Sequence, residues 1–468
     1  MARYAGLSRE PSREIRSSDV LRFSASLCNP VPSVSSVTWV GIDFGTTNSA
    51  VAFVDGDSAP RLAQFPTAHG SSPTFPSVLY FEPKKPSVAG AEAIERYLAS
   101  ETKGRFIQSL KAYLADRTFE GTGIGTQHYT LERLIALIGK HMSDRLGLAA
   151  WPPPRRIILG RPVHFSNPPD PELDDFATGR LLSAIRLAGF DEIVFEYEPV
   201  AAAYAYEARL TRDERILIGD FGGGTSDFTI ISIGPGVRSR GRQASDIIGT
   251  DGVPIAGDAF DKRIIRNLVA PRLGMGGEYL SPPHKFLPVP SWPYERLERW
   301  HYLSFLKSPS TLEMLERVRR TASTPERLEA FLLLINNELG YQLHEAVQRT
   351  KFELSSATEA EFAFESGPVT IRKRVTRADF ETWIAEEITS MSGCVDRLMS
   401  ASGLAFGDID RVFLTGGSSF VPAVRKIFTA RFGDAKVTGG EELTSVATGL
   451  ALRAREQWPA DRDPVETR

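Results

Sequence analysis

Apolar and polar positions follow the same pattern in two distant parts of this chain. In each, an apolar run reaches Asp-Phe-Gly, passes through a short cluster of glycine and hydroxyl residues, and continues as a second apolar run. The copies span Val40 to Phe53 and Ile216 to Ile231, with the aspartates at Asp43 and Asp220. The pattern predicts two β-hairpins whose turns leave backbone N–H groups free to bind an anion. A carboxylate beside each turn suits a phosphate that carries Mg²⁺. The repetition therefore predicts two similar lobes that close on a Mg-nucleotide.

Elsewhere, apolar residues recur at helix spacing in some segments and form short continuous runs in others. Helices are expected over 91–98, 131–146, 181–188, 200–209, 257–269, 312–354 with a break near Pro325, 380–399, from Pro422 onward and over 445–455. Strands are expected over 74–81, 156–163, 193–197 and 410–415. Because strands and helices alternate in both halves, the fold class is predicted to be α/β.

Composition excludes several classes of protein. The 468 residues are 42% hydrophobic and 24% charged, which is typical of a globular chain with two or three lobes. A net charge of −3 favours neither nucleic acid nor a membrane surface as partner. Two cysteines, Cys28 and Cys394, are too few for a disulfide framework and indicate a reducing, cytoplasmic location. No apolar run reaches the roughly 18 residues of a membrane span, and the seven histidines show no metal or triad spacing.

The residues around the two turns supply candidate chemistry. Asp43, Asp220 and Glu198 are expected around Mg²⁺, mostly through water, because Mg²⁺ sheds its water reluctantly. Glu198 stands between a strand and a helix, where it also suits a plain N-terminal helix charge. The Thr225 hydroxyl either reaches a phosphate or satisfies the backbone of its own turn. Gly416 to Ser418 permits close approach of a flat or phosphorylated group, although glycine turns are common.

Together these motifs resemble the nucleotide-binding domain of the 70-kDa heat-shock chaperone family, within the actin-like ATPase superfamily. The resemblance covers about Thr38 to Arg455 and keeps the order of the motifs. The segments that carry it are Gly41 to Ser49, Glu198 to Tyr204, Asp220 to Asp227, Gly257 to Asp261, Lys351 to Ser356 and Leu414 to Pro422. Sugar kinases and actin share the architecture, but Gly-Thr-Thr-Asn-Ser together with Glu-Pro-x-Ala-Ala-Ala is specific to the chaperone branch.

The resemblance implies a fold, two cofactors and a set of site residues. The fold would be two similar lobes, duplicated ribonuclease-H-like units, flanking a cleft for ATP or ADP with Mg²⁺. The implied catalytic residues are Lys111, Glu198, Asp220 and Thr225, and the metal residues are Asp43, Glu198 and Asp220. The implied nucleotide-binding residues are Gly45, Thr46, Thr47, Asn48, Gly222, Gly223, Gly224, Thr225, Gly257, Asp258, Lys351, Phe352, Ser355, Gly416, Gly417 and Ser418. For Lys111, in a polar Ser-Leu-Lys segment, a solvated helix lysine is the competing interpretation.

The same resemblance divides the chain into segments. The expected segments are a disordered extension over 1–36, a first lobe over 37–212 that includes a C-terminal helix at 441–458, a second lobe over 213–440 with an insert at 271–310, and a tail over 459–468. Trp292 and Tyr302 in the insert belong either to a partner site or to a lid packed on its own lobe.

The chain also departs from the family pattern. Phe352 stands where the family usually has an arginine beside the adenine, and Phe420 replaces another arginine after Gly-Gly-Ser-Ser. A phenylalanine can stack on a base but cannot donate a hydrogen bond, so the adenine affinity is expected to differ from the family's. A position in the hydrophobic core is the competing interpretation for both residues. Pro162 matches the family's proline switch, but the arginine expected several residues later is absent. The chain ends about where the ATPase domain ends, which indicates a truncated subgroup without the usual peptide-binding domain.

The sequence therefore predicts a slow Mg-dependent ATPase of chaperone type that acts by nucleotide-driven lobe closure. Its partners are expected to be an adenine nucleotide and a protein client of unknown identity. Two alternatives stay open: a small-molecule kinase of the sugar-kinase type, and a nucleotide switch or scaffold that does not hydrolyse.

Overall fold

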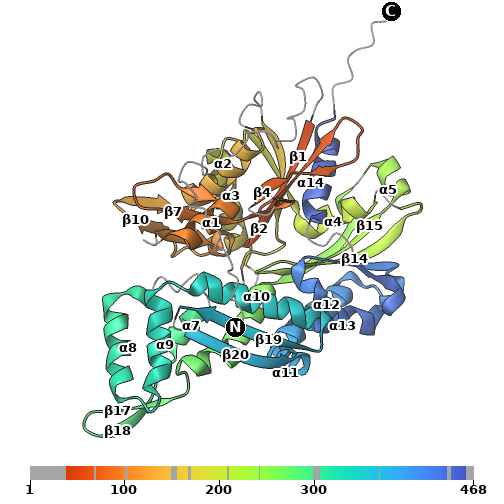
Figure 1. Ribbon diagram of the computed structural model, residues 1–468. Coiled ribbons are helices and arrows are strands. Elements are labelled where there is room, and N and C mark those ends of the chain that lie inside the picture. Colours follow the sequence, from red (N-terminus) through yellow and green to blue (C-terminus); the bar gives the residue numbers. More distant parts are fainter. Residues whose placement is uncertain are drawn as a thin grey trace, which may run out of the picture. The chain divides into compact units, whose positions relative to one another are not determined.

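The structure is a computed structural model. It describes residues 38–459 except 68–69, 101–103, 149–154, 167–169, 208–209, 242, 299–305, 368 and 440–443. The extension predicted over 1–36 lies outside the described residues, as does the predicted tail apart from Pro459. Mixed sheets and many helices make up the described part (Figure 1), and the α/β fold class is confirmed.

The first half of the chain builds a sheet around the first hairpin. Strands β1 (Thr38–Asp43) and β2 (Asn48–Asp55) are antiparallel, and β12 (Arg156–Arg161) and β13 (Glu192–Tyr197) extend the sheet in parallel beyond β1. The short strands β3 (Arg61–Leu62) and β6 (Thr74–Pro76) pair with β2 on the other side. The strand order is thus β13-β12-β1-β2-β3.

The side chains of this sheet alternate between two hydrophobic cores because the strand period is two. Val40 and Ile42 pack with helices α2 (Leu131–Arg145) and α3 (Pro171–Leu187). Trp39 and Ile158 point to the other face and pack with α4 (Glu198–Glu207) and the C-terminal helix α14 (Ser445–Gln457).

Helix α14 approaches its neighbours backbone to backbone. An added Cβ on Gly449 would lie 1.6 Å from the carbonyl oxygen of Ala201 in α4, and one on Gly41 would lie 2.3 Å from the nitrogen of Ala451. The small residues of α14 are therefore required for this packing. The same core contains Ile216 and Ile218 of the second sheet, so α4 and α14 lie between the two sheets (Figure 1).

The second half repeats the arrangement around the second hairpin. Strands β14 (Glu214–Phe221) and β15 (Ser226–Ile233) are antiparallel, and β21 (Arg411–Thr415) and β22 (Val437–Gly439) extend the sheet in parallel beyond β14. Strand β16 (Ile247–Val253) pairs with β15, so the order is β22-β21-β14-β15-β16. Each sheet thus has its hairpin followed by two parallel strands, as the repeated pattern predicts.

Smaller elements surround the first sheet. They are β4 (Phe65–Thr67), β5 (Gly70–Ser72), β7 (Val78–Phe81), β8 (Val88–Ala89), α1 (Ala91–Ala99), β9 (Arg105–Gln108), the 3₁₀ helix η2 (Leu110–Tyr113), β10 (Gly121–Ile124) and β11 (Gln127–Thr130). The expected strand over 74–81 is two strands, β6 and β7, because Ser77 interrupts the ladder.

Helices dominate the remainder of the second half. They are α5 (Pro235–Arg240), α6 (Gly257–Ile264) continued by a π turn (Ile265–Val269), α7 (Trp292–Leu297), α8 (Pro309–Thr321), α9 (Pro325–Asn336), α10 (Gly340–Ser356), α11 (Arg377–Trp383), α12 (Ala385–Ser402) and α13 (Pro422–Phe432). Two hairpins accompany them, β17 (Glu278–Ser281) with β18 (Lys285–Pro288) and β19 (Glu359–Ser366) with β20 (Val369–Thr376).

The long helical pattern over 312–354 breaks twice rather than once. The expected break near Pro325 separates α8 from α9, which lie side by side (Figure 1). The second break falls at Glu338, whose φ of 54° is left-handed and ends α9. Asn336, Asn337 and Gly340 flank this break, and residues of these types are common where a helix ends, so the sequence contains a local signal that the expected helix over 312–354 did not include.

The aromatic insert packs partly into its own lobe. Tyr294 is fully buried, stacks on Phe331 with ring centroids 4.8 Å apart, and donates its hydroxyl proton to the carbonyl oxygen of Leu273 at 2.9 Å. Trp292 is 37% exposed. Trp300 and Tyr302 lie outside the described residues.

Candidate functional site

The turns of the two hairpins face each other across a cavity of about 320 Å³. An added Cβ on Gly223 would lie 2.9 Å from Oγ1 of Thr47, and one on Gly224 would lie 3.6 Å from Oγ1 of Thr46. Thr46, Gly224 and Thr225 line the cavity. The structure therefore brings together the hydroxyl residues of the first turn and the glycines of the second.

The second turn is braced by two other predicted site segments. The carbonyl oxygen of Gly222 accepts from the N–H of Gly257 at 3.4 Å and from the Ser418 hydroxyl at 3.5 Å. The carbonyl oxygen of Gly223 accepts from the N–H of Asp258 at 2.8 Å. Within the turn, the N–H of Gly222 donates to the carbonyl oxygen of Thr225 at 3.0 Å. The conformation of the second turn is therefore fixed by hydrogen bonds.

The conformation of the first turn is restricted by close backbone packing. An added Cβ on Gly45 would lie 1.9 Å from the carbonyl oxygen of Asn48, so only glycine fits there. The carbonyl oxygen of Thr47 accepts from the N–H of Ser77 at 2.8 Å. Asn48 itself is exposed at the start of β2.

Lys111 is buried in the site, not solvated on a helix. It lies on η2 and forms an ion pair with Glu198 at 2.6 Å, with both side chains 9% exposed. Burial lowers its pKa, but Glu198 and Asp43 outweigh that effect, so the pKa of Lys111 is raised and the lysine is charged. The polar surroundings of Lys111 in the sequence gave no sign of this burial.

Arg180 of α3 fixes the segment that follows Lys111. Its guanidinium pairs with Glu132 at 2.6 Å and donates to the carbonyl oxygens of Tyr113, Asp116 and Phe119 at 3.3, 3.2 and 3.0 Å. One buried cation thus holds the end of η2 and the loop after it, and so positions Lys111.

Three aspartates beside Lys111 and Glu198 have raised pKa values. Burial and then the Glu198 charge raise the pKa of Asp43 from 3.8 to about 7. Burial, then Glu198 and Asp43, hold the pKa of Asp220 well above its usual range. Burial and Glu198 raise the pKa of Asp227 to about 7, although Asp227 accepts hydrogen bonds from Thr225 and Val163.

The charge balance of this cluster fits a divalent cation. Four carboxylates, at Asp43, Glu198, Asp220 and Asp227, share one buried lysine, so full ionisation leaves excess negative charge that a cation would neutralise. Within the described ranges, no three Asp, Glu, His or Cys side chains are arranged to hold a metal ion directly. Contact through water, as predicted for Asp43, Glu198 and Asp220, stays a prediction.

The cavity has further lining residues that the sequence analysis left out. His344, Lys262 and Glu298 line it together with Asp258 and Asp261. Burial lowers the pKa of His344 to about 4, so this histidine is neutral near pH 7. A single histidine on α10 carries no spacing signal, and only the packing of α10 against α6 reveals its place.

The residues expected on ribose and base lie beside the cavity, not in its lining. Lys351 forms an ion pair with Asp261 at 2.7 Å and donates to the carbonyl oxygen of Gly257 at 3.3 Å. The Ser355 hydroxyl donates to the carbonyl oxygen of Lys351 within α10. Phe352 and Phe420 are 71% and 46% exposed, on elements that contact each other.

Gly416 and Gly417 connect β21 to the short helix that carries Phe420. Gly416 has a φ of 82°, and an added Cβ would lie 2.1 Å from the carbonyl oxygen of Phe221. The glycine thus lets the β21 turn approach the end of β14, which brings Ser418 to the second turn. Gly417 starts the 3₁₀ helix Gly417–Phe420.

The loop after β12 connects the site to α3. Pro162 lines the cavity, and the N–H of the next residue, Val163, donates to Asp227 at 2.9 Å. His164 bonds through Nδ1 to Asp174 of α3 at 2.7 Å. The predicted departure at 167–169 lies outside the described residues.

In the part of the chain that the structure describes, helices long and apolar enough for a membrane span are absent.

Comparisons with known proteins match both halves of the chain. A family model described as "Hsp70 protein" matches residues 175–272 and 333–463. That match includes Glu198, the second turn, Gly257 and the Gly416 turn, but not the first turn or Lys111. The "Chaperone protein DnaK" of Thermosipho africanus (strain TCF52B) and that of Thermosipho melanesiensis (strain DSM 12029 / CIP 104789 / BI429) are each 26% identical to this chain over 423 residues.

The DnaK alignments cover 89% of this chain and 58% of each relative, so the chain spans less than two thirds of the length of these relatives. The chain therefore belongs to the 70-kDa heat-shock protein family and has its actin-like ATPase fold.

Proposed function

We propose that this protein binds ATP and ADP with Mg²⁺ and hydrolyses ATP slowly. One observation carries the proposal: a buried cluster of four carboxylates and one lysine lies beside a cavity of about 320 Å³ between two facing glycine turns. Turn N–H groups bind phosphate oxygens, and excess carboxylates accept a cation, so both halves of a Mg-nucleotide are accommodated.

Each turn has a distinct role in this proposal. Thr46, Thr47 and the N–H groups of Gly223 to Thr225 cradle the phosphates, while the N–H of Gly222 closes the turn by donating to the carbonyl oxygen of Thr225. Asp43, Asp220 and Glu198 hold Mg²⁺ through water. When bound, Mg²⁺ neutralises charge on the phosphate oxygens.

Three residues would act around the γ-phosphate and the attacking water. Glu198 orients it, and Lys111 places a positive charge beside the γ-phosphate. Thr225, which bonds to Asp227, presents its hydroxyl at the cavity wall. Such positioning and charge stabilisation are the main protein contributions to phosphoryl transfer.

Nucleotide binding would also hold the two halves of the chain together. The two turns come from different sheets, so a phosphate chain between them favours the closed arrangement and its loss loosens it. Because the relatives are named as chaperones, a protein client or partner is part of the proposal. A cytoplasmic location stays a prediction.

Steady-state phosphate release with Mg-ATP tests the proposal. Asp220→Asn and Thr225→Ala are each expected to lower the rate by about 100-fold, because each removes a group aimed at the phosphates. The matched controls Asp57→Asn and Thr370→Ala change exposed residues away from the cavity and should keep the rate. Undiminished phosphate release in both site variants would contradict the assigned roles.

The same assay separates hydrolysis from the predicted alternatives. A rate that rises only when a sugar is added would favour a kinase. Tight ATP binding without phosphate release over many hours would favour a non-hydrolysing switch.

A further inference from the structure

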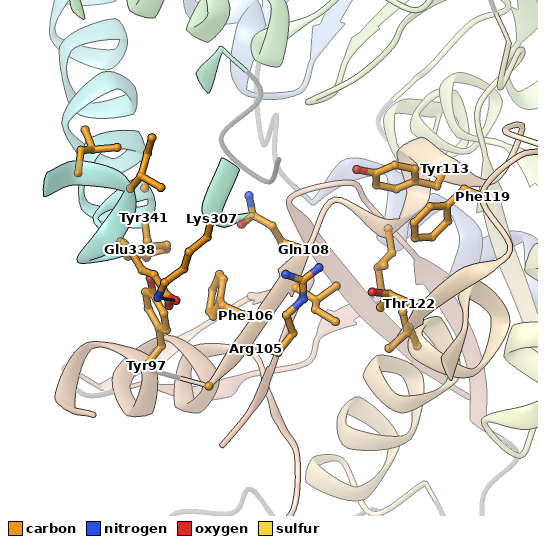
Figure 2. A pocket seen from close by; sticks show the side chains of 17 residues that line it. Tyr97, Arg105, Phe106, Gln108, Tyr113, Phe119, Thr122, Lys307, Glu338 and Tyr341 are labelled. Atoms are coloured by element: carbon orange, nitrogen blue, oxygen red, sulfur yellow. Dashed lines mark hydrogen bonds and ion pairs between the residues drawn. The ribbon is translucent and has the colours of Figure 1, made fainter. Parts of the chain in front are cut away.

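A second cavity of about 190 Å³, drawn in Figure 2, shares the short helix η2 with the proposed nucleotide site. Its lining comes from β9 and η2 in the first half of the chain and from α9 and α10 in the second. Leu110 of η2 lines this cavity, Lys111 lines the nucleotide cavity, and Tyr113 lines both. The short helix is therefore a common wall.

Two groups of aromatic rings form flat walls in this cavity. Phe106 contacts Tyr97 with ring centroids 4.8 Å apart and Tyr341 with centroids 5.7 Å apart. Tyr113 and Phe119 form the other group, with centroids 4.4 Å apart. Figure 2 shows Arg105 and Gln108 between these two groups. Aromatic faces of this kind suit a planar apolar ligand.

Gln108 supplies a hydrogen-bond donor without a partner. Its side chain is only 8% exposed, and Nε2 has no hydrogen-bond partner among the described residues. A buried donor without a hydrogen-bond partner costs free energy. A ligand that accepts a hydrogen bond from Nε2 would recover that free energy. The last torsion of glutamine is soft, so a small rotation turns the N–H toward an occupant of the cavity.

The charged lining residues favour an anion. Lys307 is paired with Glu338 at 2.6 Å, and Arg105 adds a second cation to the wall. Burial lowers the pKa of Arg105 and Glu338 raises it, but an arginine stays charged in proteins. The described charged residues of the wall thus sum to one positive charge.

We propose that this cavity binds a small planar carboxylate, one aromatic ring with its acid group directed at Gln108 and Arg105. A cavity of roughly 150 Å³ in another protein holds benzene, so the present volume holds one substituted ring. This site is separate from the nucleotide site and goes beyond the proposed function. Because its walls come from both halves of the chain, the bound carboxylate favours their present arrangement.

The carboxylate also acts on the nucleotide site through η2. Ser109, between Gln108 and η2, has a left-handed φ of 55°, an unusual conformation for serine that neighbouring contacts must maintain. A ligand hydrogen-bonded to Gln108 strengthens those contacts. It thereby restricts the motion of Lys111, which lies two residues after Ser109. Release of ADP is therefore expected to slow when the carboxylate is bound.

Calorimetric titration of the full chain with benzoate, without nucleotide, tests the site. Benzoate is expected to bind with a dissociation constant of about 1 mM, typical of a ligand with so few atoms. Gln108→Leu should weaken binding by about tenfold, because a hydrogen bond to a charged group is lost. Benzamide has the same shape without the charge. It should bind to the unaltered protein no more tightly than benzoate binds to the Gln108→Leu variant.

Two further variants test the site even if the Gln108→Leu variant does not fold. Thr122→Phe places a ring into the cavity from the partly exposed strand β10 and should abolish the heat of binding. Gln457→Leu, at an exposed position near the end of α14, should leave it unchanged. Absence of heat at about 20 mM benzoate, twenty times the expected constant, would overturn the site. Equal affinity in the Gln108→Leu and unaltered proteins would overturn it too.

Release of a fluorescent ADP analogue measures the coupling. Saturating benzoate is expected to slow release by a factor of about three, a modest coupling between sites. An unchanged rate in the presence of bound benzoate would refute transmission through η2. If the analogue does not bind at all, the proposed function fails while the benzoate titration still decides the second site.

Discussion

The turn between β1 and β2 and the turn between β14 and β15 both follow Asp-Phe-Gly, yet their surroundings differ. In the first hairpin Asp43 lies opposite Ala50, whereas in the second Asp220 lies opposite Asp227. The second hairpin thus brings two carboxylates to the cavity and the first brings one. The only lysine in the carboxylate cluster among the described residues, Lys111, is supplied by the first half.

The two turns also keep their shape by different means. An added Cβ on Gly45 would lie 1.9 Å from the Asn48 carbonyl oxygen, whereas one on Gly222 would make only an ordinary van der Waals contact at 3.6 Å with the Thr225 carbonyl oxygen. The second turn depends instead on hydrogen bonds from Gly257, Asp258 and Ser418. Similar sequences therefore give one turn set by sterics and one set by its neighbours, and substitutions should separate the two.

Removing the cation of the cluster should have the largest effect. Lys111→Met leaves Glu198 and the aspartates buried without their positive partner, which is expected to cost about 3–5 kcal/mol of unfolding free energy. Denaturant unfolding at pH 8 measures the loss. Lys85→Met, in an exposed ion pair on the same half of the chain, should change stability by less than about 0.5 kcal/mol.

A double variant distinguishes charge from packing in this result. Lys111→Met with Glu198→Gln removes both members of the pair and should restore part of the lost stability, because no unpaired charge from the pair remains. If the double variant is no more stable than Lys111→Met alone, the loss comes from packing and the buried-charge account is wrong.

The two glycines after Asp-Phe give the next largest contrast. Gly45→Ala forces a methyl group against the Asn48 carbonyl and should destabilise the protein by roughly 3 kcal/mol. Gly222→Ala meets its nearest atom at 3.6 Å and should cost less than about 1 kcal/mol. Thermal melts of the two variants side by side check the contrast, and equal losses would refute the steric difference.

The features predicted correctly from the sequence are those encoded locally. Strand periodicity, a glycine turn and a preceding Asp-Phe all lie within a dozen residues, so both hairpins and their repetition were predictable. The proline at 325 likewise marked the start of α9. The juxtaposition of the two turns was predicted from the repetition of the pattern, and the resemblance implied the same cleft.

The features that were missed depend on distant packing. Lys111 is buried because Glu198, 87 residues later, folds against it, and its neighbours Leu110 and Ala112 do not reveal that pairing. His344 reaches the cavity only because α10 packs on α6. Such positions are set by the assembled core rather than by the segment itself.

Asp43 should show a pH-dependent effect of intermediate size. Its pKa is raised from 3.8 to about 7, so between these values the unfolded chain ionises while the folded chain does not. By linkage the contribution of Asp43 to stability falls as pH rises from about 4 to 7 and stays low above that. Asp43→Asn should therefore raise the unfolding free energy by about 2 kcal/mol at pH 8, given the partial exposure of the site.

The comparison between pH values is the decisive part of that experiment. Near pH 3, below both pKa values, Asp43 is almost fully protonated in the folded and in the unfolded chain, so the stabilisation by Asp43→Asn should nearly vanish. His344, whose pKa is lowered to about 4, becomes protonated at acid pH and destabilises both proteins equally, so its effect cancels in the difference. A stabilisation of the same size at pH 3 and pH 8 would exclude ionisation of Asp43 as its cause.

The smallest expected effect on stability, and the sharpest on recognition, concerns Phe352 and Phe420. Both come from the second half and are 71% and 46% exposed, so replacing both with alanine should change the unfolding free energy by less than about 0.5 kcal/mol each. If they stack on the base, the double variant should bind ADP about tenfold more weakly, since stacking on one aromatic ring contributes roughly 1–3 kcal/mol. Phe286, 64% exposed on the β17–β18 hairpin, provides the control: the Phe286→Ala variant should bind ADP with unchanged affinity.

Inorganic triphosphate, which has no base, should bind all of these proteins equally, because it requires only the two turns. Weaker triphosphate binding by the double variant would mean that the phenylalanines support the second turn rather than the base.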